Sequence, residues 1–275
     1  MDLLSYWSLK ERPFEATWDT RFFYQSKDHD EALNRLSFLV GEETMLLGML
    51  TGEIGCGKTL TRAVFTERLE RERFKVVTQE NSGFTFNNLM DSVLQNLQNG
   101  HHKPVRTKFA RCEQLRMEAA RVREEHRHLV LIFDEAQEMP PATLNELKML
   151  TNFNGGGKSY LTIILVGQPE LRRHVESVPA INQRISLRFH LNSLDVAATG
   201  DYLRQRLLAA GHPTGELFEA DAVQKTFDAS QGVPRAVNRI AKLALEHAWL
   251  MGNATVSSES VGAVIRDLER QQQSA

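Results

Sequence analysis

The chain has little cysteine, since Cys56 and Cys112 are the only thiols among 275 residues. Two cysteines are too few for a disulfide framework and their spacing does not suggest a zinc site, so we expect both to be reduced and structural. An uninterrupted apolar run of about 18 residues, as a membrane-spanning helix needs, is missing. The N-terminus "MDLLSYWSLKERPF" lacks a basic flank followed by an apolar signal core. We therefore expect a cytoplasmic protein with no integral membrane segment.

The chain also lacks an excess of charge of one sign. It has 33 basic and 35 acidic side chains, a formal net charge of −2. Any binding of nucleic acid or anionic lipid must therefore be local. Hydrophobic residues make up 41% of the chain, and at this length they can bury the core of one large domain or two.

Five segments have the composition of β-strands. Four of them are near-continuous apolar runs rich in Val, Ile and Leu, which is typical of parallel strands covered on both faces. They are residues 44–50, 74–79, 128–134, 160–167 and 185–191. Helical patterns lie between them at residues 57–72, 84–98, 108–126 and 141–152. This alternation predicts an α/β fold with a doubly wound parallel sheet.

The composition changes after about residue 192. No strand-like run follows, and Gly211, Gly232 and Gly252 punctuate helical segments. We predict a nucleotide-binding α/β core with an N-terminal extension over residues 1–192, and a small all-helical domain over residues 193–275.

The segment "GEIGCGKT" fits the pattern G-x-x-x-x-G-K-[ST] and lies between a predicted strand and a helix. Its glycines let backbone N–H groups surround a phosphate at a helix N-terminus. Lys58 would reach the β- and γ-phosphates of ATP, and the Thr59 hydroxyl would bind Mg²⁺. The alternative is an ordinary strand-to-helix turn that happens to contain Gly-Lys, but here the motif, its flanks and a second motif coincide. The predicted cofactor-binding residues here are Gly52, Glu53, Ile54, Gly55, Cys56, Gly57, Lys58, Thr59 and Leu60.

The second motif, "LVLIFDEA", is an apolar strand that ends in two carboxylates. Asp134 is placed for Mg²⁺, and Glu135 could polarise a water for in-line attack on the γ-phosphate. Ligands of open α/β sheets bind at the carboxyl ends of the strands, where both residues are expected. Taken alone, the pair could be two solvated acids that cap a helix. A small-molecule kinase shares both motifs and is the main chemical alternative.

Three polar residues further along complete the predicted catalytic machinery. Gln168 follows the fourth strand and could sense or orient the γ-phosphate if that strand is central. Arg184 precedes the last strand, where a cation could project toward the nucleotide of a neighbouring subunit. Arg235, in "GVPR" at the start of a helix, could reach back to the γ-phosphate. For either arginine alone, a surface ion pair is the alternative.

In this order, the phosphate loop, "DEA", "GQPEL", "QRI" and "GVPR" resemble the AAA+ superfamily. The opening "YWSLKERPFEATWDTRFFYQSKDHDEALNRLSFLV" and "FDEAQEM" resemble the ExeA/GspA-type ATPases. The resemblance covers residues 6 to about 265. It implies an AAA+ P-loop NTPase core of five strands with a helical lid, and an ATP-hydrolysing homo-oligomer, a hexamer-like ring or a filament.

The resemblance also implies roles for single residues. Gln168 would be sensor 1, Arg184 the arginine finger and Arg235 sensor 2. The segment around Arg12, Pro13 and Phe14 would lie near the adenine, although Phe14 fits an apolar core equally well. Asn81, at the polar end of the second strand, is placed where AAA+ proteins keep a residue that restrains the catalytic glutamate.

Three functions stay open at this point. The first is an ATPase that switches or remodels a secretion or pilus assembly. ExeA-type proteins often continue into a membrane span and a periplasmic domain, but this chain stops at Ala275. The second is a DNA-binding transposition regulator, as in the similar TniB/TnsC/MuB ATPases. The third is a nucleotide-gated scaffold with little turnover. A basic stretch at residues 100–111 is either a phosphate-contacting patch or a solvated connector; its cations are Lys103, Arg106, Lys108 and Arg111.

Overall fold

The computed structural model describes residues 2–17, 19–155 and 157–273. Its internal contacts divide the chain into two compact units. Unit 1 combines Met1–Lys27, Glu53–Leu60 and Asn192–Ala275, and unit 2 combines Asp28–Gly52 and Thr61–Leu191. The N-terminal segment, which we assigned to the nucleotide-binding core, therefore groups with the C-terminal helices.

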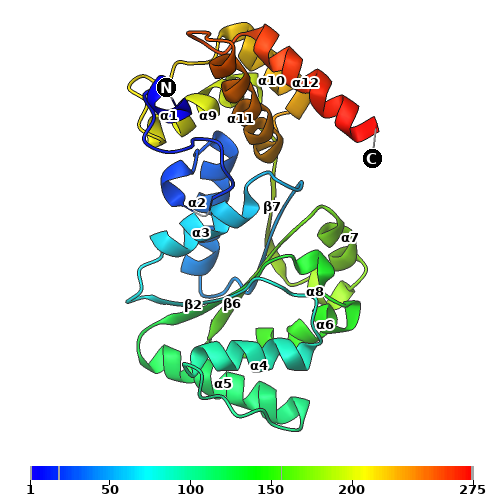
Figure 1. The fold of residues 1–275 in the computed structure, drawn as a ribbon. Helices are drawn as coiled ribbons and strands as arrows, with labels where there is room; N and C mark the ends of the chain where they lie inside the picture. The colour runs from blue at the N-terminus through cyan, green and yellow to red at the C-terminus, as the bar shows by residue number, and fades with distance from the viewer. Residues whose placement is uncertain (1, 18, 156, 274–275) are drawn as a thin grey trace. The chain divides into compact units, whose positions relative to one another are not determined.

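Unit 2 contains a five-stranded parallel sheet in the order β2-β3-β6-β1-β7 (Figure 1). The strands are β1 (Leu47–Gly52), β2 (Phe74–Gln79), β3 (His128–Phe133), β6 (Leu161–Gly167) and β7 (Ile185–Leu191). The predicted fold class is confirmed, and β6 is the central strand. The first strand begins later than predicted, and it also ends later because Thr51 pairs with Gly167, and Gly52 with Leu191. A short hairpin of β4 (Asn154–Gly155) and β5 (Lys158–Ser159) was not predicted.

Helices cover both faces of this sheet. They are α2 (Lys27–Gly41), α3 (Lys58–Arg68), α4 (Phe86–Leu97), α5 (Lys108–Glu124), α6 (Pro141–Glu146), α7 (Glu170–Glu176) and α8 (Pro179–Asn182). The hydroxyls of Thr85 and Thr107 accept hydrogen bonds from the first turns of α4 and α5 and so set where these helices begin. The helix predicted over residues 141–152 changes after α6 into a 3-10 helix, η3 (Leu147–Asn152).

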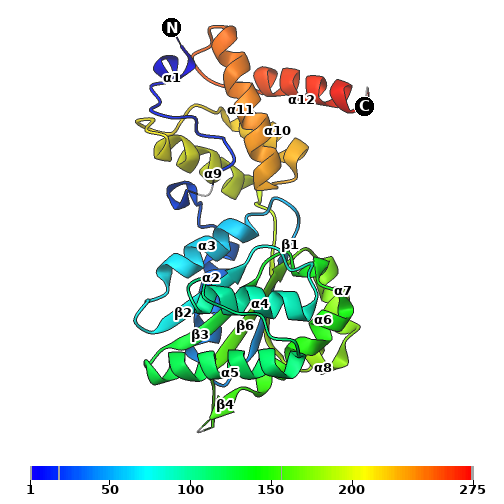
Figure 2. The ribbon, with the colours of Figure 1, turned by 60° about the horizontal axis from the view of Figure 1, so that its bottom comes forward.

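The core of unit 2 follows from strand alternation. Leu129, Leu131 and Phe133 of β3 are fully buried in a cluster with apolar residues of α4 and α5, which lie side by side on one face (Figure 2). The intervening residues of a strand point to the opposite face. On β1 one of these is Gly48, where a Cβ would lie 2.3 Å from the Leu39 side chain of α2. The glycine therefore allows α2 to pack directly on the sheet.

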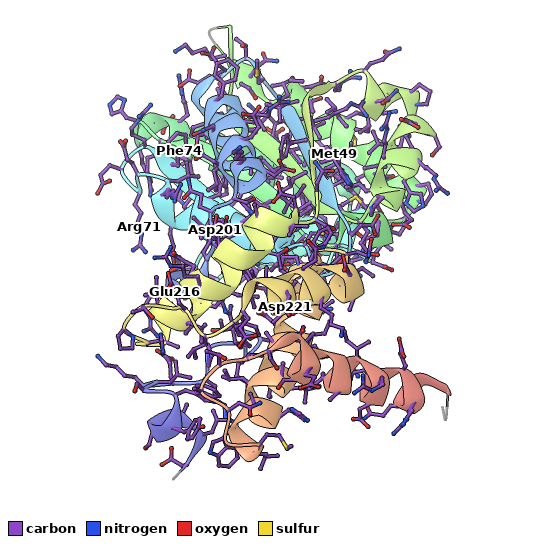
Figure 3. The ribbon with its side chains drawn as sticks, turned by 90° about the horizontal axis from the view of Figure 1, so that it is seen from above. Met49, Arg71, Phe74, Asp201, Glu216 and Asp221 are labelled. Carbon is purple, nitrogen blue, oxygen red and sulfur yellow. The ribbon has the colours of Figure 1, made fainter. Side chains whose placement is uncertain are left out.

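Unit 1 is helical and includes the N-terminal segment. Its elements are α1 (Leu3–Tyr6), a 3-10 helix, η1 (Thr20–Phe22), α9 (Val196–Ala209), α10 (Ala220–Ser230), α11 (Pro234–Leu250) and α12 (Ser258–Gln273). A single isolated bridge, between Phe218 and Val256, is the one extended pairing in its described residues. Asp221 on α10, labelled in Figure 3, accepts a hydrogen bond of 2.6 Å from the Ser258 hydroxyl and so connects α10 to the start of α12.

The aromatic N-terminal segment contributes to the core of unit 1. Trp7, Phe14 and Phe22 are buried in one cluster with apolar residues of α9 and α11. Arg206 of α9, 3% exposed, donates hydrogen bonds to the carbonyls of Pro13 (2.6 Å) and Glu15 (2.7 Å). These bonds satisfy the guanidinium in a buried setting and fix the path of the segment.

Two expectations from composition concern thiols and membrane segments. Cys56 and Cys112 are both free thiols, as expected. Among the described residues, no helix has the length and apolar character that crossing a membrane requires.

We predict a pH-dependent loss of stability in unit 2 from His128, at the start of β3. Its Nε2 lies 2.9 Å from the Thr162 hydroxyl. Burial lowers the pKa of His128 from 6.5 to about 4. The negative charge of Glu43 raises this pKa and the positive charge of Arg123 lowers it, both by less than burial does. Below pH 6.5 the unfolded chain therefore binds a proton that the folded chain does not, so the free energy of unfolding falls as the pH falls toward 4.

From pH 7 to 4.5 this single group should cost about 2 kcal/mol. Urea unfolding at several pH values should show this decrease in the wild type and a clearly smaller one in His128→Leu. Arg123 and Lys158 lower the folded-state pKa of Glu43 to about 2. The stability that Glu43 contributes is therefore lost mainly below pH 4.5. Equal pH dependence in the two proteins would contradict the assignment.

Candidate functional site

The predicted phosphate loop, residues 52–59, follows β1 and leads into α3. Gly55 and Gly57 have φ angles of +87° and +94°, a left-handed backbone that glycine adopts without the cost a side chain would add. The buried Lys58 donates from Nζ to the Glu53 carbonyl at 2.9 Å, so its ammonium lies over the loop itself. Thr59 is the second residue of α3.

Arg235 meets this loop within unit 1. Its backbone N–H donates to the Gly55 carbonyl at 3.2 Å, and a Cβ at Gly55 would lie 2.7 Å from the Cβ of Arg235. Gly55 is therefore required by the approach of the α11 N-terminus as well as by its own backbone angles. The predicted sensor arginine and the loop thus lie together, with the Arg235 side chain exposed.

Asp134 is a buried carboxylate and not the solvated helix cap of the alternative interpretation. It is 3% exposed, its N–H donates to the Gln79 carbonyl, and its own carbonyl accepts from the Ser82 hydroxyl at 2.6 Å. Its Oδ2 lies 3.0 Å from Nε of Arg62, a buried arginine of α3. Because the pair is buried, the guanidinium compensates the charge of Asp134 with little screening.

Glu135 adopts a left-handed backbone conformation, with φ +49° and ψ +39°. A residue with a Cβ pays about 1 kcal/mol or more for this conformation, which often occurs at functional sites. Its N–H donates to Oδ1 of Asp134 at 2.9 Å. Its Oε2 lies 2.7 Å from Nε2 of Gln137 and 3.4 Å from Nε2 of Gln168. The predicted base and the predicted phosphate sensor therefore lie together at the ends of neighbouring strands β3 and β6.

Sequence reasoning missed Gln137 and Arg62, although both carry a positional signal. Gln137 completes the "DEAQ" segment two residues after Glu135, and Arg62 lies one helical turn after Lys58. Asn81, which we considered as the restraint on the glutamate, accepts at Oδ1 from the Gly83 N–H at 2.9 Å.

The two arginines around β7 differ in their partners. Arg184 donates from Nη1 to the Ala180 carbonyl at 2.6 Å, and no carboxylate among the described residues lies within ion-pair distance of it. Arg188, within β7, donates to the side-chain oxygen of Asn182.

Two of the four cations in the basic stretch of residues 100–111 are paired with carboxylates. Lys108 forms an ion pair with Glu146, and Arg111 lies 2.8 Å from Asp91. Only Lys103 and Arg106 remain as exposed cations without such a partner in the described part of this stretch. These ion pairs favour the alternative interpretation, in which the stretch is a solvated connector whose C-terminal end is held by ion pairs.

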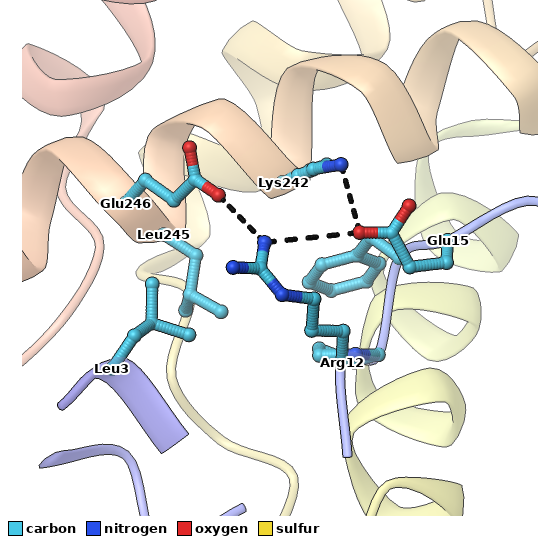
Figure 4. A pocket seen from close by; sticks show the side chains of 8 residues that line it. Leu3, Arg12, Glu15, Lys242, Leu245 and Glu246 are labelled. Atoms are coloured by element: carbon cyan, nitrogen blue, oxygen red, sulfur yellow. Dashed lines mark hydrogen bonds and ion pairs between the residues drawn. The ribbon is translucent and has the colours of Figure 1, made fainter. Parts of the chain in front are cut away.

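The segment expected near the adenine lines a pocket of unit 1 (Figure 4). The pocket's charges are paired: Arg12 lies 2.9 Å from Glu246, and Lys242 lies 2.7 Å from Glu15. Phe14 is 4% exposed and its ring stacks edge-on against Phe218 at 5.8 Å. Phe14 therefore lies in an apolar core, which was the alternative interpretation of this residue.

The two predicted Mg²⁺ ligands, Thr59 in unit 1 and Asp134 in unit 2, each have a chemistry that suits this ion. No group of three or more His, Cys, Asp or Glu side chains that could hold a metal occurs in the described residues. Mg²⁺ does not need one, because it is usually bound by one or two protein oxygens together with substrate phosphates and water. The Asp134 carboxylate and the Thr59 hydroxyl are hard oxygen donors of this kind.

The chain is similar to known proteins in sequence and in fold. Residues 42–175 match the AAA domain family. General secretion pathway protein A of Aeromonas hydrophila is 29% identical over 250 residues, which are 90% of this chain and 45% of that protein. The chain thus spans less than half the length of this relative.

Solved structures show the same fold. The ORC2 protein of Aeropyrum pernix has a TM-score of 0.68 at 18% identity and covers 94% of this chain and 71% of its own. Cdc6p of Pyrobaculum aerophilum has a TM-score of 0.66 at 18% identity, with 90% and 70% covered. The RuvB branch migration motor of Thermotoga maritima has a TM-score of 0.59 at 16% identity, with 90% and 73% covered. The resemblance seen in the sequence is therefore confirmed: the chain has the P-loop AAA+ fold, its residues 42–175 match the AAA domain family, and most of its length is similar to general secretion pathway protein A.

Proposed function

We propose that the chain binds ATP with Mg²⁺, hydrolyses it as a homo-oligomer, and uses the cycle to switch or remodel a partner assembly. The observation that carries this proposal is the convergence of Glu135 and Gln168 at the carboxyl ends of adjacent strands, 3.4 Å apart. A carboxylate beside a polar amide at this edge suits orientation of a water for attack on a γ-phosphate. The AAA domain and the P-loop fold support a nucleotide-driven activity of this kind.

Each part of the proposed reaction has a residue to perform it. The loop N–H groups and Lys58 would hold the phosphates, while Gln168 and Arg235 would contact the γ-phosphate. Glu135 would take the proton of the attacking water. Bound Mg²⁺, held by Thr59 and Asp134, would neutralise charge on the phosphate oxygens. Arg184 would act on the nucleotide of a neighbouring subunit.

A secretion- or pilus-type partner is favoured here because the curated relative is general secretion pathway protein A. The DNA-binding alternative has less support, since only two cations of the basic stretch are exposed and unpaired in the described residues. We keep the cytosol as the proposed location of the ATPase.

The test is turnover and assembly measured on one purified sample. We expect Mg²⁺-dependent phosphate release from ATP, and a higher sedimentation coefficient with a non-hydrolysable ATP analogue than with ADP. Tight nucleotide binding without turnover at any protein concentration would leave the scaffold function instead. ATP-dependent binding of labelled duplex DNA that weakens steeply with salt would favour the transposition function.

A further inference from the structure

Gln137 has a position that no predicted role accounts for. It lies in the 3-10 helix Ala136–Glu138 directly after the left-handed residue Glu135 and is 9% exposed. The backbone reversal at Glu135 turns the chain so that the amide of Gln137 reaches both the Glu135 carboxylate and the end of β6.

Chemistry determines which way this amide points. The Gln168 backbone N–H can only donate, and the Gln137 atom 3.0 Å from it is assigned as Oε1. The other end of the amide, Nε2, then faces Oε2 of Glu135 at 2.7 Å and donates to it. The opposite orientation would place two donors together at Gln168 and two acceptors together at Glu135. The side chain therefore bridges the two residues in one orientation only.

The structure makes room for this bridge at the end of β6. A Cβ at Gly167 would lie 2.6 Å from Oε1 of Gln137 and 3.3 Å from its backbone nitrogen. Because Gly167 has no side chain, the amide can reach the Gln168 N–H. A displacement at Gln168 would therefore be transmitted through one rigid amide group to the carboxylate of Glu135.

We propose that Gln137 is a positioning residue, which aims Glu135 at the attacking water and couples its orientation to contact of Gln168 with the γ-phosphate. This inference rests on the proposed function, in which Glu135 is the base and Gln168 contacts phosphate. Gln137 itself touches neither substrate nor water in this role. In this proposal Gln137 takes the role that we considered for Asn81.

The test compares Gln137→Leu, which keeps the size and removes both hydrogen bonds, with the wild type. If the Glu135 carboxylate is wrongly oriented, hydrolysis slows while phosphate binding is unaffected. We therefore expect kcat to fall about 10- to 100-fold. The Kd for ATP, measured by fluorescence titration, should change less than about 3-fold. Gln98→Leu is the matched control, because Gln98, just after the end of α4, makes an equivalent amide–carboxylate bond of 2.9 Å to Glu118 of α5. It should leave both constants unchanged.

A second arm separates positioning from a general structural role. In a Glu135→Ala background the base is absent, so adding Gln137→Leu should lower the residual single-turnover rate less than about 2-fold. The same loss in both backgrounds would show that Gln137 acts independently of Glu135 and would overturn the proposal. If Gln137→Leu does not fold, Gln137→Glu keeps the shape, removes the donor and should cause the same loss of kcat.

The two levels of the proposal fail in different ways. If the wild type hydrolyses ATP and Gln137→Leu has its full kcat, the positioning role is wrong and the proposed function stands. If the wild type binds ATP and shows no hydrolysis under conditions of assembly, the proposed function is wrong, and the positioning role falls with it.

Discussion

Lys58→Ala is expected to abolish ATP binding, whereas Glu135→Gln is expected to bind ATP normally and to hydrolyse it at least about 100-fold more slowly. Lys58 is buried, with its ammonium over the loop. Loss of this charge would leave the phosphates uncompensated in a confined site and weaken binding by roughly 100-fold or more. Glu135→Gln keeps the size of the side chain and removes only the group that takes the proton.

The measurement pairs equilibrium binding of a fluorescent ATP analogue with steady-state phosphate release. Lys103→Ala controls for loss of an exposed lysine, and Glu138→Gln for loss of an exposed acid three residues after Glu135. Both controls should behave as the wild type. Unimpaired turnover in Glu135→Gln would remove Glu135 from the catalytic role, and unchanged binding by Lys58→Ala would remove Lys58 from the phosphate site.

Arg184→Ala is expected to bind ATP normally and to lose about 10³- to 10⁵-fold in turnover, as when a cation acting on the transferring phosphoryl group is removed. Within the described residues, the guanidinium of Arg184 has one hydrogen bond, to the Ala180 carbonyl, and no carboxylate partner. Its charge is therefore not committed to an ion pair, unlike that of the buried Arg62, which lies 3.0 Å from Asp134.

If Arg184 acts on the nucleotide of a neighbour, specific activity should rise with protein concentration, since a monomer lacks this cation. Mixing Arg184→Ala with Lys58→Ala should restore some turnover, because one variant supplies nucleotide sites and the other supplies arginines. Arg188→Ala, which removes an exposed arginine bound to Asn182, is the matched control and should keep full activity. A mixture as inactive as its parts, with assembly intact, would exclude the trans role.

The sequence alone determined the fold class and the motifs of the site. The apolar runs around "HLVLIFD" and "YLTIILVG" predicted buried parallel strands, because a strand covered on both faces has no polar alternation. The glycines at positions 55 and 57 and the lysine after them predicted a phosphate loop, since this local backbone requirement is written directly in residue type.

Tertiary structure decided what surrounds each of these residues. The pairing of Arg62 with Asp134, and of Gln137 with Glu135 and Gln168, depends on which strand ends lie beside each other and on a left-handed turn at a glutamate. Neither the adjacency of the strand ends nor the left-handed turn can be read from a local sequence pattern. Likewise, Phe14 of the N-terminal segment was equally compatible with a ligand site and a core. Only its packing among the C-terminal helices assigned it to the core, because burial is a property of the folded chain and not of a residue's sequence neighbours.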